Sequence, residues 1–145
     1  MRRTFAVAAL CTAALLVAAV HASEAPTPAY QKAMKDMGAA NTALRAHVKE
    51  IESAGAYPDY TTVQKDAAAL KTAFAETLAF WTAKKVPDAV KMSETGVKGV
   101  EALEKAIADK SYDGLASAAT TIGSTCGACH KAFREQLPDG TYAIK

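Results

Sequence analysis

The sequence has 145 residues, of which 50% are hydrophobic, and its formal net charge at pH 7 is +2. This length suggests a single domain, because domains typically run to about 100–150 residues. Arg2 and Arg3 account for two of the 17 basic residues, and the other 15 balance the 15 acidic residues. This balance excludes the strongly basic surface that is typical of nucleic-acid binding.

The first 22 residues have the pattern of a secretory signal peptide. A basic pair at the start is followed by the apolar segment 5–20, and Val20-His21-Ala22 then provides a cleavage-like site. The apolar segment is too short to span a bilayer comfortably, so we favour removal over an uncleaved membrane anchor. We expect residues 23–145 to form the mature domain in the periplasm, without a membrane-spanning segment.

The mature chain is rich in Ala, Lys, Glu and Leu and has few β-branched alternations, which favours helices. The first predicted helix covers residues 28–53, with Thr27 as its N-cap and Pro28 at its first position, where a missing N–H costs nothing. Its inward face follows steps of three and four residues and consists of Tyr30, Met34, Met37, Asn41, Leu44, Val48 and Ile51.

The second predicted helix covers residues 60–84, and the third runs from Pro87 or Asp88 to about residue 109. Trp81 fits either the end of the second helix or the start of the third. The inward faces consist of Val63, Ala67, Leu70, Phe74, Leu78 and Trp81 in the second helix and of Val90, Val97, Val100, Leu103 and Ile107 in the third.

The fourth predicted helix covers residues 113–136, with Asp113 as its N-cap and Pro138 after its end. Residues 141–145 are expected to be extended or loosely docked. Four helices of similar length with short connectors predict an all-α, antiparallel four-helix bundle with up-down-up-down topology. The inward face of the fourth helix consists of Leu115, Ala119, Ile122, Cys126, Cys129 and Phe133.

The segment Cys126-Gly127-Ala128-Cys129-His130 matches the pattern for covalent attachment of a c-type haem. Residues three apart share one face of a helix, so both sulfurs point the same way and each thiol can add across one vinyl group of the haem. His130 then reaches the iron as an axial ligand. We therefore expect one covalently attached haem c near the C-terminal end of the last helix.

Three other chemistries use a close pair of cysteines. A thioredoxin-like dithiol accompanies a βαβ pattern, which this sequence lacks. A zinc site needs four ligands, whereas His47 is the only other histidine of the mature chain and no further cysteine lies there. An exported protein can also form a structural disulfide, but the histidine directly after the second cysteine favours haem attachment.

The motif lies about fifteen residues from the end of the chain, and this position resembles that in class II c-type cytochromes, the group of cytochrome c prime and its low-spin relatives. The resemblance also rests on Phe133-Arg134, on Asp113 thirteen residues before the motif, and on the first-helix segment 30–37, Tyr-Gln-Lys-Ala-Met-Lys-Asp-Met. It covers essentially the whole mature chain. Trp81 resembles the bundle tryptophan of the group, although Pro87 replaces the phenylalanine expected six residues later.

The second axial ligand is expected from the first helix, because its start faces the end of the fourth helix in an up-down-up-down bundle. Met34 matches the family position over the iron, and the resemblance to the low-spin branch implies that it is the sixth ligand; the alternative is that it only fills the core. Met37 is expected to pack against the porphyrin. His47 lies roughly 20 Å from Met34 along the helix axis, and Met92 lies off the main apolar face, so neither is expected to reach the iron.

Three further residues are candidate haem contacts. Arg134, one helical turn after His130, matches an arginine that pairs with a haem propionate in the family, with a solvated surface arginine as the alternative. Gln31 resembles a polar family position near the propionates, but Tyr30 stands where the family often has arginine. Phe133 is expected to pack against the haem or the neighbouring helix.

A haem held by His130 and Met34 has both axial positions filled, which favours reversible one-electron transfer rather than enzymatic turnover. The expected function is that of a periplasmic electron carrier whose partners are other periplasmic redox proteins. The alternative is a five-coordinate protein, similar to cytochrome c prime, that binds nitric oxide or carbon monoxide. The sequence leaves open whether the chain is a monomer or a homodimer.

Overall fold

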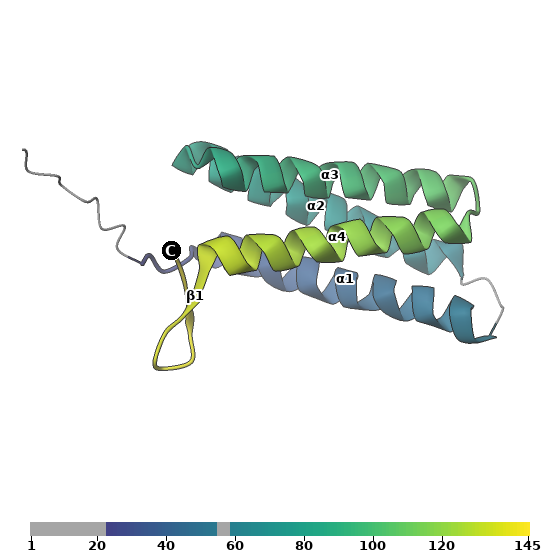
Figure 1. Cartoon of the computed structure of the whole chain (residues 1–145), viewed down its shortest axis with the longest axis horizontal. Coiled ribbons are helices and arrows are strands. Elements are labelled where there is room, and N and C mark those ends of the chain that lie inside the picture. Colours follow the sequence, from purple (N-terminus) through teal and green to yellow (C-terminus); the bar gives the residue numbers. More distant parts are fainter. Residues whose placement is uncertain (1–22, 55–58) are drawn as a thin grey trace, which may run out of the picture.

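The computed structural model describes residues 23–54 and 59–145 and consists of four long helices followed by a short hairpin (Figure 1). The signal peptide predicted for residues 1–22 lies outside the described residues. No helix in the described part of the chain is both long enough and apolar enough to cross a membrane. The elements are α1 (Pro28–Ala54), α2 (Tyr60–Lys84), α3 (Pro87–Ala108), α4 (Tyr112–Phe133), β1 (Arg134–Gln136) and β2 (Tyr142–Ile144).

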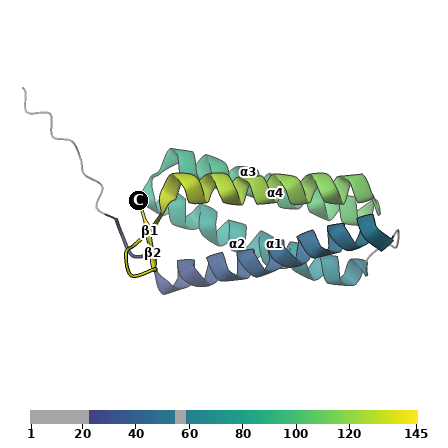
Figure 2. The same cartoon turned by 60° about the horizontal axis from the view of Figure 1, so that its bottom comes forward.

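Consecutive helices run in opposite directions and pack side by side (Figures 1 and 2). Each helix contacts the next one along the chain, and α4 closes the ring on α1 through the smallest of the four interfaces. The predicted all-α fold is confirmed, and its arrangement is that of a four-helix bundle. The end of α4 therefore lies at the same end of the bundle as the start of α1 and the α2–α3 connection (Figure 1).

The bundle encloses a core to which all four helices contribute. All residues predicted for the four inward faces are buried or partly buried, so the periodic pattern is confirmed. Removal of this apolar surface from water is the main favourable contribution to folding. The largest fully buried side chains are Trp81, Leu44, Leu70, Leu103, Leu115, Ile122, Val63 and Val100.

The first three helices begin and end close to the predicted residues. At the start of α1 the backbone N–H of Tyr30 donates to Oγ1 of Thr27 at 3.2 Å, which confirms Thr27 as the cap. At the end of α2, Lys85 adopts a left-handed conformation with φ of 56°, and its N–H donates to the carbonyls of Thr82 and Trp81. Trp81 therefore belongs to α2.

The fourth helix differs from the prediction at both ends. Its cap is Ser111 rather than Asp113, because Oγ of Ser111 accepts the backbone N–H of Gly114 at 3.1 Å. The helix ends at Phe133 rather than at residue 136, because Arg134–Gln136 pairs in antiparallel fashion with Tyr142–Ile144. The last predicted turn of the helix is thus the first strand of a hairpin.

The hairpin is firmly docked on the end of the bundle. Ala143 and Ile144 are buried, and the backbone N–H groups of Glu24 and Ile144 donate to each other's carbonyls at 2.8 Å. The segment before α1 is therefore paired with the end of the chain. Together these segments cover the end of the bundle where α4 ends (Figure 2).

We expect Ser111→Ala to destabilise the protein by about 1 kcal/mol, because the N–H of Gly114 loses its acceptor at the start of α4. Asp113→Ala is the matched control, since it removes the acidic side chain of the first turn without removing the cap, and its effect is expected to be smaller. Urea unfolding of both variants measures the difference. A larger loss in Asp113→Ala than in Ser111→Ala would show that the capping residue has been misassigned.

Gly96 in α3 allows α2 to approach closely. A Cβ added to Gly96 would lie 2.0 Å from Cε1 of Phe74, whose ring is buried. Gly123 in α4 is the opposite case, because nothing lies within 4 Å of a Cβ added there. Only the first of these two glycines is required by packing.

The two glycines therefore respond in opposite directions to the same substitution. Gly96→Ala is expected to cost about 1–3 kcal/mol, because the Phe74 ring must move out of a packed core. Gly123→Ala is expected to stabilise the protein by about 0.5–1 kcal/mol through helix propensity alone. Thermal or urea unfolding distinguishes the two cases, and equal effects of the same sign would contradict the described packing of Phe74 on α3.

Candidate functional site

A cleft of about 720 Å³ lies at the end of the bundle where α1 begins and α4 ends. Its volume is within the range of about 300–1,000 Å³ that is common for small-molecule and cofactor sites. The start of α1 contributes Tyr30, Gln31 and Met34, and the hairpin closes one side. From α4 and the hairpin come Cys129, His130, Phe133, Arg134, Thr141, Tyr142, Ala143 and Ile144.

A smaller cavity of about 30 Å³ lies next to this cleft, toward the interior of the bundle. Met34, Cys129 and His130 line both spaces. The smaller cavity is otherwise surrounded by Met37 of α1, Phe74 and Thr77 of α2, Met92 and Ser93 of α3, and Thr125 and Cys126 of α4. Side chains of all four helices thus meet around the motif.

All eight residues that the sequence singled out as site residues line one or both of these spaces. They are Gln31, Met34, Met37, Cys126, Cys129, His130, Phe133 and Arg134. The cleft is formed by segments about a hundred residues apart in the chain. The pairing of α1 with α4 is what brings these segments together.

The motif presents neutral groups to the cleft. Cys126 and Cys129 are free thiols and are partly buried. Burial raises the pKa of both thiols above the ordinary value, so they are protonated at neutral pH. Burial, and secondarily the charge of Arg134, lowers the pKa of His130, so its imidazole is neutral at neutral pH and keeps a lone pair for a ligand.

Three rings of an aromatic cluster, those of Tyr30, Trp81 and Phe133, line the cleft. The rings of Tyr30 and Phe80 stack at 4.0 Å between centroids, and Trp81 contacts Phe133 at 5.2 Å. Trp81 is 2% exposed, and the Tyr30 hydroxyl interacts with its side chain. The aromatic cluster thus gives the cleft an apolar wall in which the buried indole N–H has a polar neighbour.

The structure places two of the predicted haem contacts, Arg134 and Gln31, in local environments that differ from those expected. Arg134 lies in β1 rather than on the helix, because the hairpin begins there, and its guanidinium stacks 4.3 Å from the ring centroid of Tyr142. It still borders the cleft beside His130. Nε2 of Gln31 donates to the carbonyl of Pro26 at 3.0 Å, so this amide is already engaged.

Sequence reasoning missed four groups at this site: Met92, the hydroxyls of Thr77 and Ser93, and the hairpin. The prediction that Met92 lies off the main apolar face is wrong, because Met92 precedes the buried Gly96, Gly99 and Leu103 by four, seven and eleven residues and therefore shares their face of α3. The predicted face was drawn through the valines of α3, and it left out the small buried residues that define the inward side of its first turns. The hairpin could not be inferred from residues 134–136, which continue a helical pattern until their pairing with β2 is known.

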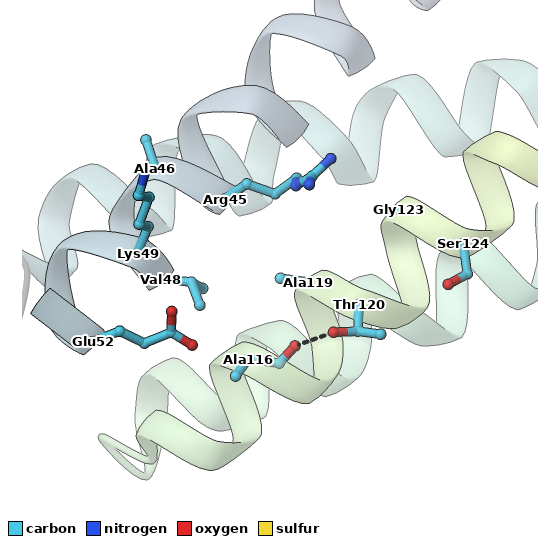
Figure 3. A pocket seen from close by; sticks show the side chains of 10 residues that line it. All are labelled: Arg45, Ala46, Val48, Lys49, Glu52, Ala116, Ala119, Thr120, Gly123 and Ser124. Atoms are coloured by element: carbon cyan, nitrogen blue, oxygen red, sulfur yellow. Dashed lines mark hydrogen bonds between the residues drawn. The ribbon is translucent and has the colours of Figure 1, made fainter.

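Another groove, of about 770 Å³, lies at the opposite end of the α1–α4 interface (Figure 3). Figure 3 shows side chains such as Arg45, Val48 and Glu52 on α1 facing small residues of α4, among them Ala119 and Gly123. None of its lining residues is a cysteine, histidine or methionine. Among the residues that the structure describes, the two thiols, the three thioethers and the imidazole of His130 instead surround the cleft and the small cavity at the other end.

His47 also lies outside both spaces around the motif. Its Nε2 is 3.3 Å from a carboxylate oxygen of Asp66, and its Nδ1 is 3.7 Å from Glu50. This imidazole is thus engaged with acidic neighbours. Within residues 23–54 and 59–145, no group of three or more His, Cys, Asp or Glu side chains is placed to hold a metal ion.

Comparison of the chain with protein-family models, curated proteins and solved structures found no match.

The buried phenol of Tyr30 predicts a specific loss of stability at alkaline pH. Burial, together with the nearby Cys129, raises the pKa of Tyr30 well above its ordinary value of 10.0. The unfolded chain therefore loses the phenol proton above about pH 10, while the folded protein retains it. The contribution of the protonated phenol to stability is fully present below that pH and is lost as the pH rises above it.

We expect the free energy of unfolding of the wild type to fall relative to that of Tyr30→Phe as pH rises from about 9 to about 11. Urea unfolding across this range measures it. Tyr142→Phe, at an exposed tyrosine, is the control. If the two variants show the same pH dependence, Tyr30 is not shielded from solvent as described.

Proposed function

We propose that this chain is a periplasmic monohaem c-type cytochrome of the class II type that carries one electron at a time between redox proteins. The observation that carries the proposal is the convergence of Cys126, Cys129 and His130 with Met34 around one pair of adjoining cavities. The periplasmic location rests on the sequence pattern of residues 1–22. The proposal includes no catalytic activity.

The residues of the cleft fit a haem in several respects. Two protonated thiols on successive turns of α4 suit thioether formation with the two vinyl groups, and a neutral imidazole suits iron ligation. Arg134 and Lys35 border the cleft with positive charge that suits propionate carboxylates. The cleft thus combines uncharged groups that suit the apolar macrocycle with positive charge that suits its acidic edge.

The bound haem supplies an iron that alternates between the ferrous and ferric states. The chain's own residues have three roles in this proposal. Cys126 and Cys129 would hold the group covalently, His130 and the thioether of Met34 would bind its iron, and the aromatic cluster with Trp81 and Phe133 would limit access of water. Methionine ligation and burial both favour the reduced state and so raise the potential.

The smaller cavity supports electron transfer over catalysis. Its two hydroxyl groups on α2 and α3 are engaged: Thr77 donates to the carbonyl of Ala73 and Ser93 to that of Ala89, each at 2.8 Å. Apart from His130 and the two thiols of the motif, its other described lining residues carry no titratable group. A general acid or base for turnover of a bound substrate is therefore missing from this lining.

One observation favours the gas-binding alternative. The cavity of about 30 Å³ lies next to His130 and is large enough for a water-sized molecule. If Met34 only packs there, a diatomic gas has space beside the iron. The two functions therefore differ in a single bond, that between the iron and a thioether.

The first test is covalent attachment of haem to the mature protein, produced in the periplasm with a haem c maturation system. We expect an alkaline pyridine spectrum of a c-type haem that survives denaturation, and its loss in the Cys126→Ala/Cys129→Ala double variant. His47→Ala is the matched control for His130→Ala, and only the second is expected to perturb the iron spectrum. A folded wild-type protein without covalent haem would overturn the proposal.

The absorption spectrum of the same preparation distinguishes the carrier from the gas binder. Sharp low-spin bands after reduction, with a methionine-to-iron charge-transfer band in the near infrared of the oxidised form, are expected for the carrier. A high-spin spectrum that shifts readily under carbon monoxide would instead support the five-coordinate alternative.

A further inference from the structure

We infer that Met92 is a second thioether within reach of the iron site, able to replace Met34 as axial ligand. This inference rests on the proposed haem function and concerns a residue that the sequence pattern excluded. Met34, on α1, and Met92, on α3, line the same small cavity together with His130. α1 and α3 are the two neighbours of α4 in the bundle.

The surroundings of the three methionines around this cavity differ. Met37 is 5% exposed and belongs to the hydrophobic core, and Met34 packs against that core. Met92 is partly buried and belongs to neither of the two hydrophobic clusters. Its side chain is therefore the least committed to core packing, although it borders the cavity next to the motif.

The chemistry of methionine suits an exchange of this kind. The side chain is unbranched and has three rotatable bonds, so it adapts to irregular space. A thioether is a neutral ligand, so breaking one iron–sulfur bond and forming another moves no proton and no electron. Truncation of Met34 to alanine leaves room in the same cavity into which Met92 can move.

The other groups around the cavity are less able to take this place. The hydroxyls of Thr77 and Ser93 donate to backbone carbonyls, and Cys126 and Cys129 are assigned to the covalent links. Met37 lies one turn further into the bundle and is packed among core residues. Met92 is thus the remaining side chain with a ligand atom suited to haem iron.

The test is a set of spectra of the haem-loaded protein with Met34→Ala, Met92→Ala, the double variant, and Met37→Leu as the packing control. We expect the near-infrared charge-transfer band in wild type, Met92→Ala and Met37→Leu. In Met34→Ala the band is expected to persist at a shifted position, and in the double variant it is expected to be absent, with a high-spin spectrum.

The affinity of the same variants for carbon monoxide provides an independent measurement. The double variant is expected to bind the gas at least ten-fold more tightly than Met34→Ala, because in the single variant the gas must displace Met92. Loss of the band in Met34→Ala alone, with the same gas affinity as the double variant, would overturn the inference and leave the carrier function intact. Loss of the band in Met92→Ala alone would make Met92 the native ligand and also overturn it. A wild-type protein without haem or without the band would instead contradict the proposed function itself.

Discussion

The connections between helices are the constraint on which the candidate site depends. Only two residues separate α2 from α3, and three separate α3 from α4, so each helix must run back alongside the previous one. The end of α4 then lies beside the start of α1, and Met34 meets His130 although 96 positions separate them in the chain. With a long crossover in place of any of these connectors, the same helices could form a bundle in which the motif faced other residues.

Local sequence signals were sufficient for most of the fold. Thr27 and Pro28 at the start of α1, and Pro87 at the start of α3, act within one turn of the residues they organise. The inward faces follow from a period that each helix carries in itself. All eight site residues could be placed from the motif, the family resemblance and the topology, because their convergence depends only on which helix ends are adjacent.

Features that the sequence did not give depend on contacts between distant segments. Arg134 continues a helical pattern, and only its pairing with residues near the end of the chain turns it into a strand. Ser111 and Asp113, two residues apart, could each cap α4, and the choice of Ser111 depends on the exact path of the connector. Met92 was missed because the inward side of the first turns of α3 is marked by small residues such as Ser93 and Gly96, which carry no apolar signal of their own.

Neutrality is the common property of the groups around the motif. The thiols, the imidazole and the Tyr30 phenol are uncharged at neutral pH, and burial shifts the pKa of each group further toward its uncharged form. A site of low polarity disfavours added charge, and this favours the ferrous over the ferric state of the proposed haem. Positive charge from Arg134 is confined to the outer side of the cleft, where acidic groups of a haem edge would lie.

The choice between electron carrier and gas binder then becomes a competition between tethered and free ligands. In the proposed haem protein, a thioether held by the fold beside the iron would be present at an effective concentration on the order of millimolar or more, whereas a diffusing gas would have to reach a comparable concentration or bind far more strongly. A second thioether in the same cavity would strengthen this competition, because loss of one bond would leave another ligand in place. A protein that keeps its iron six-coordinate in both oxidation states undergoes little rearrangement on electron transfer. The cluster of methionines around the motif is therefore the feature that most favours the carrier.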